Sequence, residues 1–142
     1  IKLFGKMSER INEKVIEIIK YLEELESVLP RSFEEYKSDW KVRDICERRF
    51  ERIIEAVIDL GFLIIKEKKL KTPEDDKNVF DILNDNDFIS FELSEKLKDA
   101  KGMRNVIAHE YSKINDEWVY EAVTEQLIKD VEEFLKIIDK LS

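Results

Sequence analysis

The sequence contains very few of the residues that build disulfides, metal sites and tight turns. Its 142 residues include one cysteine, one histidine, two prolines and three glycines. A single cysteine excludes an internal disulfide framework, and a single histidine leaves no zinc-type ligand set within one chain. So few Gly and Pro residues also disfavour an all-β fold, which needs many turns.

Long hydrophobic runs are also missing. No apolar stretch approaches the ~20 residues that a membrane-spanning helix requires, and no signal-peptide pattern opens the chain. We therefore predict a cytoplasmic protein with no membrane association. The chain begins at Ile1 rather than Met, and residues 1–7 are left out of the fold prediction as an ambiguous or disordered start.

Acidic residues outnumber basic ones by 33 to 25, which gives a formal net charge of −8. This charge disfavours a general nucleic-acid coat protein, whose affinity comes from many phosphate contacts. It is compatible with RNA binding at a small basic cleft, whose local positive charge would have to overcome the negative average field of the protein. Arg43, Arg48 and Lys101 are candidates for that local positive charge, with ordinary surface positions as the alternative.

Apolar residues recur at steps of three and four in four long segments, which predicts four amphipathic helices. The segments are residues 8–29, 39–68, about 90–111 and 115–141. Either Ser90 or Ser94 is the expected start of the third. Together they predict an all-α fold, an antiparallel up-down four-helix bundle with one or two short extra helices, in one domain over residues 1–142.

Start and stop signals set the predicted boundaries of these helices. Ser8 is a plausible N-cap for the first helix, Pro30 ends it, and Ser32 with Glu35 forms a capping-box pattern. Thr72-Pro73 reads as the start of a short helix, and Asn115-Asp116 as the cap of the last one.

The long second helix has one apolar and one charged face. Cys46 lies on the apolar stripe, so a buried structural thiol is expected. The other face alternates in sign, which is typical of a solvated, self-paired surface; its members are Arg43, Asp44, Glu47, Arg48, Glu51, Arg52 and Glu55.

Most catalytic patterns are absent, because the chain has no glycine-rich phosphate loop and no cofactor motif. The remaining candidate is the stretch from Arg104 to His109, near the end of the third helix. Each residue also has an ordinary interpretation. His109 could be a cation that complements the helix dipole, and Arg104 could be a surface charge.

Helical geometry separates these two residues. Arg104 and His109 differ by about 140° around a helix and about 7.5 Å along it, whereas Asn105 and His109 share a face. One straight helix does not easily aim both at one phosphate. A two-fold dimer that apposes this helix with its copy would bring two arginines and two histidines to one groove.

The segment Arg104-Asn105-Val-Ile-Ala-His109-Glu-Tyr111 resembles a motif of HEPN-domain proteins: Arg, a polar residue, three spacers, His, one spacer and Tyr. The similarity is greatest to the HepT-type toxins of prokaryotic HEPN/MNT toxin–antitoxin pairs. Other features resemble that group as well, namely Phe33-Glu34-Glu35, Asp39, Arg43, Glu55-Ala56 and Gly102-Met103.

This resemblance implies a metal-independent endoribonuclease toxin that works as a homodimer, without a cofactor. His109 would transfer a proton to or from the RNA, Arg104 would hold the phosphate, and Asn105 would orient either group. The expected products are a 2′,3′-cyclic phosphate and a 5′-hydroxyl. Tyr111 would be the residue to which the partner nucleotidyltransferase antitoxin (MNT) adds AMP.

The sequence is also compatible with other interpretations. Tyr111 could simply pack its ring at the helix end. The whole chain could be a non-catalytic helical module that docks a nucleotidyltransferase and helps to position its nucleotide. It could also be a purely structural interaction protein, in which the exposed Lys/Glu faces together with Trp40 and Trp118 matter more than His109.

Overall fold

The computed structural model describes residues 9–75 and 79–141, and every regular element within these ranges is helical. The four long segments are α1 (Glu9–Glu26), α3 (Trp40–Glu67), α5 (Phe91–His109) and a final one made of α6 (Asp116–Glu121), the π-helical turn η3 (Ala122–Gln126) and α7 (Leu127–Asp139). The short helices α2 (Phe33–Ser38) and α4 (Val79–Asp85) precede α3 and α5.

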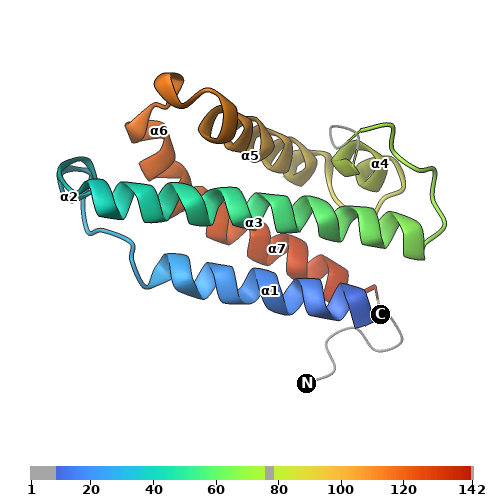
Figure 1. Ribbon diagram of the computed structural model, residues 1–142. Coiled ribbons are helices and arrows are strands. Elements are labelled where there is room, and N and C mark those ends of the chain that lie inside the picture. Colours follow the sequence, from blue (N-terminus) through green and yellow to red (C-terminus); the bar gives the residue numbers. More distant parts are fainter. Residues whose placement is uncertain (1–8, 76–78, 142) are drawn as a thin grey trace.

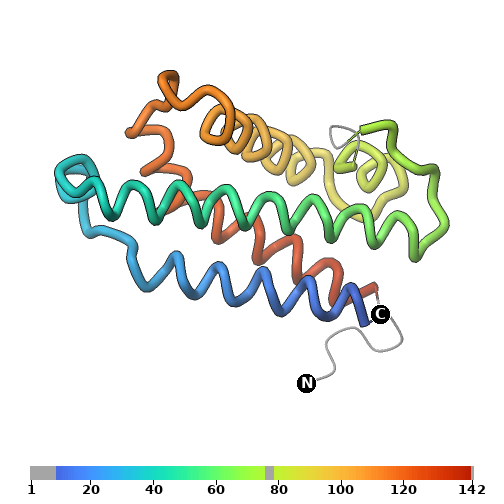
Figure 2. The backbone as a smooth tube through the Cα atoms, in the orientation of Figure 1, coloured from blue at the N-terminus to red at the C-terminus, as the bar shows by residue number. Residues whose placement is uncertain are grey.

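The four long segments alternate in direction, so the start of α1 and the end of α7 lie at the same end of the bundle (Figures 1 and 2). The predicted all-α up-down bundle with short extra helices is confirmed. None of the described helices is long and apolar enough to cross a membrane. The start at residues 1–7 and the proposed cap Ser8 lie outside the described residues.

Side-chain caps begin α2 and α3 where the sequence predicts them. The Ser32 hydroxyl accepts the Glu35 N–H at 3.2 Å. The Glu35 carboxylate reaches back to the N–H of Arg31 at 2.9 Å, one residue before the position expected in a capping box. Asp39 caps α3 by accepting the Lys41 N–H at 3.0 Å. These bonds satisfy donors that a helix start otherwise leaves unpaired.

The predicted apolar stripes meet in one core. Cys46 is fully buried within it, as predicted, and burial raises the pKa of its thiol to about 11. The largest fully buried side chains come from several helices: Tyr36, Phe50, Phe80, Phe134, Ile11, Ile18, Leu25, Ile53, Ile54, Leu60 and Ile64. Because α1, α3 and α7 all bury such residues, hydrophobic burial holds the long helices together.

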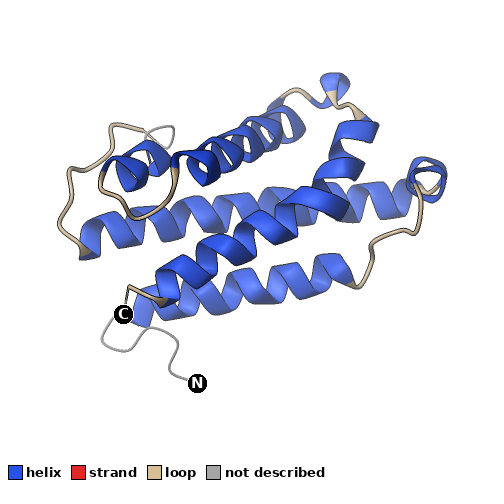
Figure 3. Ribbon diagram, turned by 180° about the vertical axis from the view of Figure 1, so that it is seen from behind, coloured by secondary structure: helices blue, strands red, loops and turns tan. Residues whose placement is uncertain are grey.

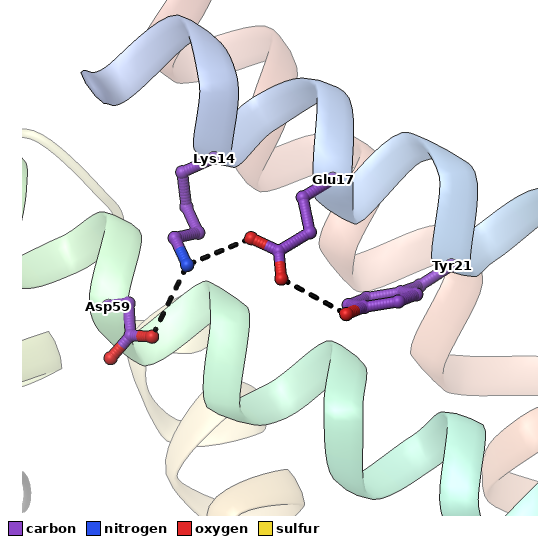
Figure 4. A network of polar contacts seen from close by, with 4 residues as sticks. All are labelled: Lys14, Glu17, Tyr21 and Asp59. Atoms are coloured by element: carbon purple, nitrogen blue, oxygen red, sulfur yellow. Dashed lines mark hydrogen bonds and ion pairs between the residues drawn. The ribbon is translucent and has the colours of Figure 1, made fainter.

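A polar network runs along the outer seam between α1 and α3 (Figure 4). Lys14 Nζ lies 2.8 Å from a carboxylate oxygen of Glu17 and 3.5 Å from one of Asp59. The Tyr21 hydroxyl donates to Glu17 at 3.0 Å. Partly exposed ion pairs of this kind contribute about 0–1 kcal/mol each, so they add little to the stability of the α1–α3 contact.

The expectation of one continuous last helix is wrong. The π-helical turn Ala122–Gln126 separates α6 from α7, and the chain bends there, as Figure 3 shows from behind. Within this turn the Thr124 hydroxyl donates a 2.7 Å hydrogen bond to the carbonyl oxygen of Tyr120. Threonine bonds to a carbonyl four residues earlier bend helices, which gives a physical reason for the break.

The predicted helix start at Thr72-Pro73 is also wrong. Residues 71–75 are not helical, and α4 begins at Val79. Pro73 is buried, so its ring contributes to packing instead of opening a helix. The connection from α3 to α4 buries Pro73, and this packing outweighs the local helix-start signal of Thr72-Pro73.

The assignment of Glu47 to a solvated face is a third error. Only 7% of Glu47 is exposed, and burial together with the Asp116 and Asp44 carboxylates raises its pKa to about 7. Asp116 lies at the start of α6, and α2 packs against both α3 and α6. Because these helices converge at one end of the bundle, they cover Glu47, which the charge pattern of the α3 segment had placed in solvent.

Candidate active site

The candidate residues lie at the C-terminal end of α5. Of the two serines considered, Ser90 is the N-cap, because its hydroxyl accepts the Leu93 N–H at 3.0 Å. Ser94 lies within α5, one turn after the cap; its side chain is buried and donates to the carbonyl oxygen of Phe80 at 3.4 Å. The helix ends at His109, and the next residue, Glu110, still donates its N–H to the Val106 carbonyl.

Arg104 is directed toward α3. Its side chain is 14% exposed, and its Nη1 lies 3.9 Å from the Glu55 Oε1. A forked guanidinium can bind a carboxylate and a phosphate at once, because it carries five N–H donors. The structure therefore places the candidate phosphate-binding residue at the α3–α5 junction.

His109 is exposed, and Asn105, one turn earlier, is partly buried. This contrast with Arg104 agrees with the angular separation expected from the sequence. Within one chain, then, the arginine is turned to α3 while the histidine faces solvent at the helix end.

Tyr111 begins the short 3₁₀ helix η2 (Tyr111–Lys113) and is 68% exposed. The interpretation that its ring packs at the helix end is wrong. An exposed phenol two residues beyond His109 is accessible to a modifying enzyme.

Gly102 lies on the exposed side of α5, one turn before Asn105 and two before His109. A Cβ atom built on Gly102 would meet nothing within 4 Å. No neighbour within the described chain therefore requires a glycine here, although glycine lowers helix stability. The open space is available to another molecule.

A cavity of 280 Å³ lies on a flank of α5, between α5 and α6. Gly102, Val106 and Ile107 line it from α5, and exposed Trp118 lines it from α6. Neither Arg104 nor His109 lines it, so it lies beside the candidate residues rather than between them.

The three additional cations have different surroundings. Lys101 is only 6% exposed and is not a surface charge. Arg48 lies 3.5 Å from Glu51 of its own helix, and Arg43 donates to the carbonyl of Lys37. The alternative of an ordinary surface position is therefore wrong for Lys101, and the supply of local positive charge by these three residues stays a prediction.

The described residues contain no group of three or more His, Cys, Asp or Glu side chains arranged to hold a metal ion. The sequence placed Glu55 on the self-paired face of its helix and, with Ala56, among the features that resemble the family, but it did not predict the contact of Glu55 with Arg104. Its neighbours Ile54 and Ala56 are buried, so position 55 lies at the edge of the core. That position was a signal that its partner could come from another helix.

Comparisons with known proteins agree with the motif. The chain is 28% identical over 132 residues to the mRNA nuclease HepT of Shewanella oneidensis, covering 93% of this chain and 98% of that protein. It is 28% identical over 115 residues to the tRNA nuclease HepT of Aphanizomenon flos-aquae, covering 80% of this chain and 78% of that one.

Solved structures extend the likeness to three dimensions. The tri-AMPylated HEPN toxin of Shewanella oneidensis, solved in complex with its MNT antitoxin, superposes with a TM-score of 0.87. It shares 27% identity, and the match covers 94% of this chain and 99% of the toxin. A family model described as ribonuclease HepT-like matches residues 18–138, and the chain therefore belongs to the HepT-like ribonuclease family.

Proposed function

We propose that this chain is the endoribonuclease toxin of a prokaryotic toxin–antitoxin pair and that two copies of it form each active site. Its family is one of ribonucleases, and two relatives are named as mRNA and tRNA nucleases. The observation that carries the proposal is the arrangement at the end of α5. There Arg104, which is largely buried against α3, and His109, which is exposed, belong to one motif but face different surroundings.

The proposed reaction needs one general base and one general acid. His109 of one copy removes the proton from a ribose 2′-hydroxyl, and the 2′-oxygen then bonds to the adjacent phosphorus. The bond from phosphorus to the 5′-oxygen breaks, and His109 of the partner subunit gives that oxygen a proton. The products are a 2′,3′-cyclic phosphate and a 5′-hydroxyl, and no metal takes part.

Arg104 binds the phosphate in this scheme. Its charge is permanent, and it stabilises the extra negative charge that forms at phosphorus in the transition state. Asn105 shares a helix face with His109 and orients the imidazole or the phosphate. The open space at Gly102 supports a close approach of the second α5.

The cognate antitoxin in this proposal is an MNT-type nucleotidyltransferase. A similar toxin has been solved in complex with such a partner and carries AMP groups. The phenol oxygen of Tyr111 would attack the α-phosphorus of ATP and release pyrophosphate. The attached AMP adds negative charge and bulk two residues from His109, which opposes binding of an RNA phosphate.

The decisive experiment is RNA cleavage with divalent metals chelated. We expect wild-type protein to cut a single-stranded RNA and the Arg104→Ala and His109→Ala variants to lose most of this activity. Products should carry the cyclic phosphate, detected by mass spectrometry. Variants that cleave as fast as wild type would remove the assigned roles. Partner binding without cleavage by any preparation would instead favour the non-catalytic docking module.

A further inference from the structure

An ion pair ties the candidate active-site arginine to the neighbouring helix. Arg104 Nη1 of α5 lies 3.9 Å from Glu55 Oε1 of α3. Other inter-helix ion pairs link α1 to α3 and α4 to α5. The Arg104–Glu55 contact joins α3 to the stretch of α5 that carries the motif.

Packing fixes where both partners can place their charged ends. Glu55 lies between Ile54 and Ala56, which are 0% and 3% exposed, so its backbone is held against the core. The Glu55 side chain is 39% exposed and that of Arg104 is 14% exposed. The carboxylate therefore lies at the rim and the guanidinium just inside it.

The pair contributes little to stability, because half-exposed ion pairs are worth about 0–1 kcal/mol. Its larger effect is on the freedom of the arginine, whose side chain carries about 2 kcal/mol of rotamer entropy. At 3.9 Å the Glu55 carboxylate attracts the guanidinium without a hydrogen bond, and this attraction restricts the directions in which the other donors point. Part of the cost of ordering Arg104 is then met before RNA binds.

We infer that Glu55 is a positioning residue that orients Arg104 toward the RNA phosphate. This inference rests on the proposed nuclease function. Glu55 does not touch the reacting atoms, and its negative charge weakens the attraction for RNA. Loss of the charge should therefore lower kcat and also lower KM, whereas loss of folded protein lowers the apparent kcat and leaves KM unchanged.

The test compares Glu55→Gln, Glu55→Asp and a matched control, Asp59→Asn. Asp59 lies on the same helix one turn later and makes its ion pair with Lys14 of α1 (Figure 4). Each of the two amide variants removes one negative charge and one inter-helix ion pair. Cleavage of a single-stranded RNA oligonucleotide is measured at fixed salt with chelator, together with thermal unfolding.

We expect Glu55→Gln to lower kcat roughly ten- to a hundredfold, the range that a small misplacement of a binding group produces. Glu55→Asp should give an intermediate kcat, and Asp59→Asn should match wild type. In an Arg104→Ala background, Glu55→Gln should have no further effect, because the two residues act as one unit. Nitrogen-15 relaxation of the Arg104 Nε should show greater mobility in Glu55→Gln.

Two outcomes separate the two proposals. If Arg104→Ala cleaves normally, the proposed active site is wrong, whatever Glu55 does. If Arg104→Ala is inactive but Glu55→Gln keeps the wild-type kcat and an ordered Arg104 side chain, the positioning role alone is overturned. Equal losses in Glu55→Gln and Asp59→Asn would also overturn it, since they would reflect charge or stability in general.

Discussion

Gly61 of α3 faces Val79 of α4 so closely that a Cβ atom at position 61 would overlap the Cγ1 of Val79. The two helices reach this separation only because position 61 has no side chain. Gly102, by contrast, faces open space. The two glycines therefore have different surroundings, and the same substitution to alanine at each position is expected to have opposite effects on stability.

Gly61→Ala is expected to destabilise the protein by about 1–3 kcal/mol, because overpacking outweighs the better helix propensity of alanine. Urea unfolding followed by circular dichroism measures the change. An unchanged or higher free energy of unfolding would mean that α4 shifts without cost and that the close packing is not required.

Gly102→Ala is expected to raise stability by about 0.5–1 kcal/mol, since the methyl group meets no neighbour within the chain. If two copies of α5 approach at this face, the same methyl group should weaken dimerisation and lower RNA cleavage. Thermal unfolding, sedimentation equilibrium and cleavage rate are measured on one preparation. A stabilised variant with normal dimerisation and cleavage would place the contact between copies elsewhere.

Glu47 should make stability fall as pH rises. Burial raises its pKa from 4.5 to about 7, so the folded state disfavours the ionised form. Below the unfolded pKa this carries no cost; the cost grows between about pH 4.5 and 7 and is complete above that range. Glu47→Gln should therefore be more stable than wild type by about 1–3 kcal/mol at pH 8 and equal to it near pH 4.

Denaturant unfolding at the two pH values checks this prediction. Glu51→Gln is the control, because it lies one turn further along α3 and forms a partly exposed ion pair with Arg48. The control should gain no stability at pH 8. A loss of stability in Glu47→Gln at pH 8 would show that the carboxylate has a favourable partner there.

A shared active site predicts dominant inhibition. In a mixed dimer of wild type and His109→Ala, only one imidazole is present, so either the base or the acid is missing. Excess His109→Ala chain, allowed to exchange subunits, should reduce cleavage in proportion to the fraction of mixed dimers. Cleavage that depends only on the amount of wild-type chain would contradict the two-histidine mechanism.

Tyr111 is the expected site of AMP addition, since it occupies the tyrosine position of the motif and is 68% exposed. Co-expression with the cognate nucleotidyltransferase should increase the intact mass by AMP units and reduce cleavage. Tyr111→Phe should cleave RNA at the wild-type rate and gain no AMP at position 111, as judged by peptide mapping. AMP found only at other residues would remove this role from Tyr111.

Helix-forming segments were predictable where local signals and burial agree. Ser32 caps α2 as its capping-box pattern predicts, α3 begins directly after Asp39, where the predicted segment starts, and Cys46 is buried as its stripe requires. The errors lie where distant segments meet. Pro73 is buried outside a helix, Thr124 bends the last helix, and Glu47 is covered by the convergence of α2 and α6.

The helical class, the four amphipathic segments and the Arg104–His109 motif could be predicted without the fold, because periodicity and motif spacing are properties of neighbouring residues along one chain. The packed bundle was needed to show that Arg104 faces Glu55, that Lys101 is buried and that Gly102 is open. These depend on which helix faces which and at what register. The apolar stripes restrict that choice, but the packing of all the helices together selects it.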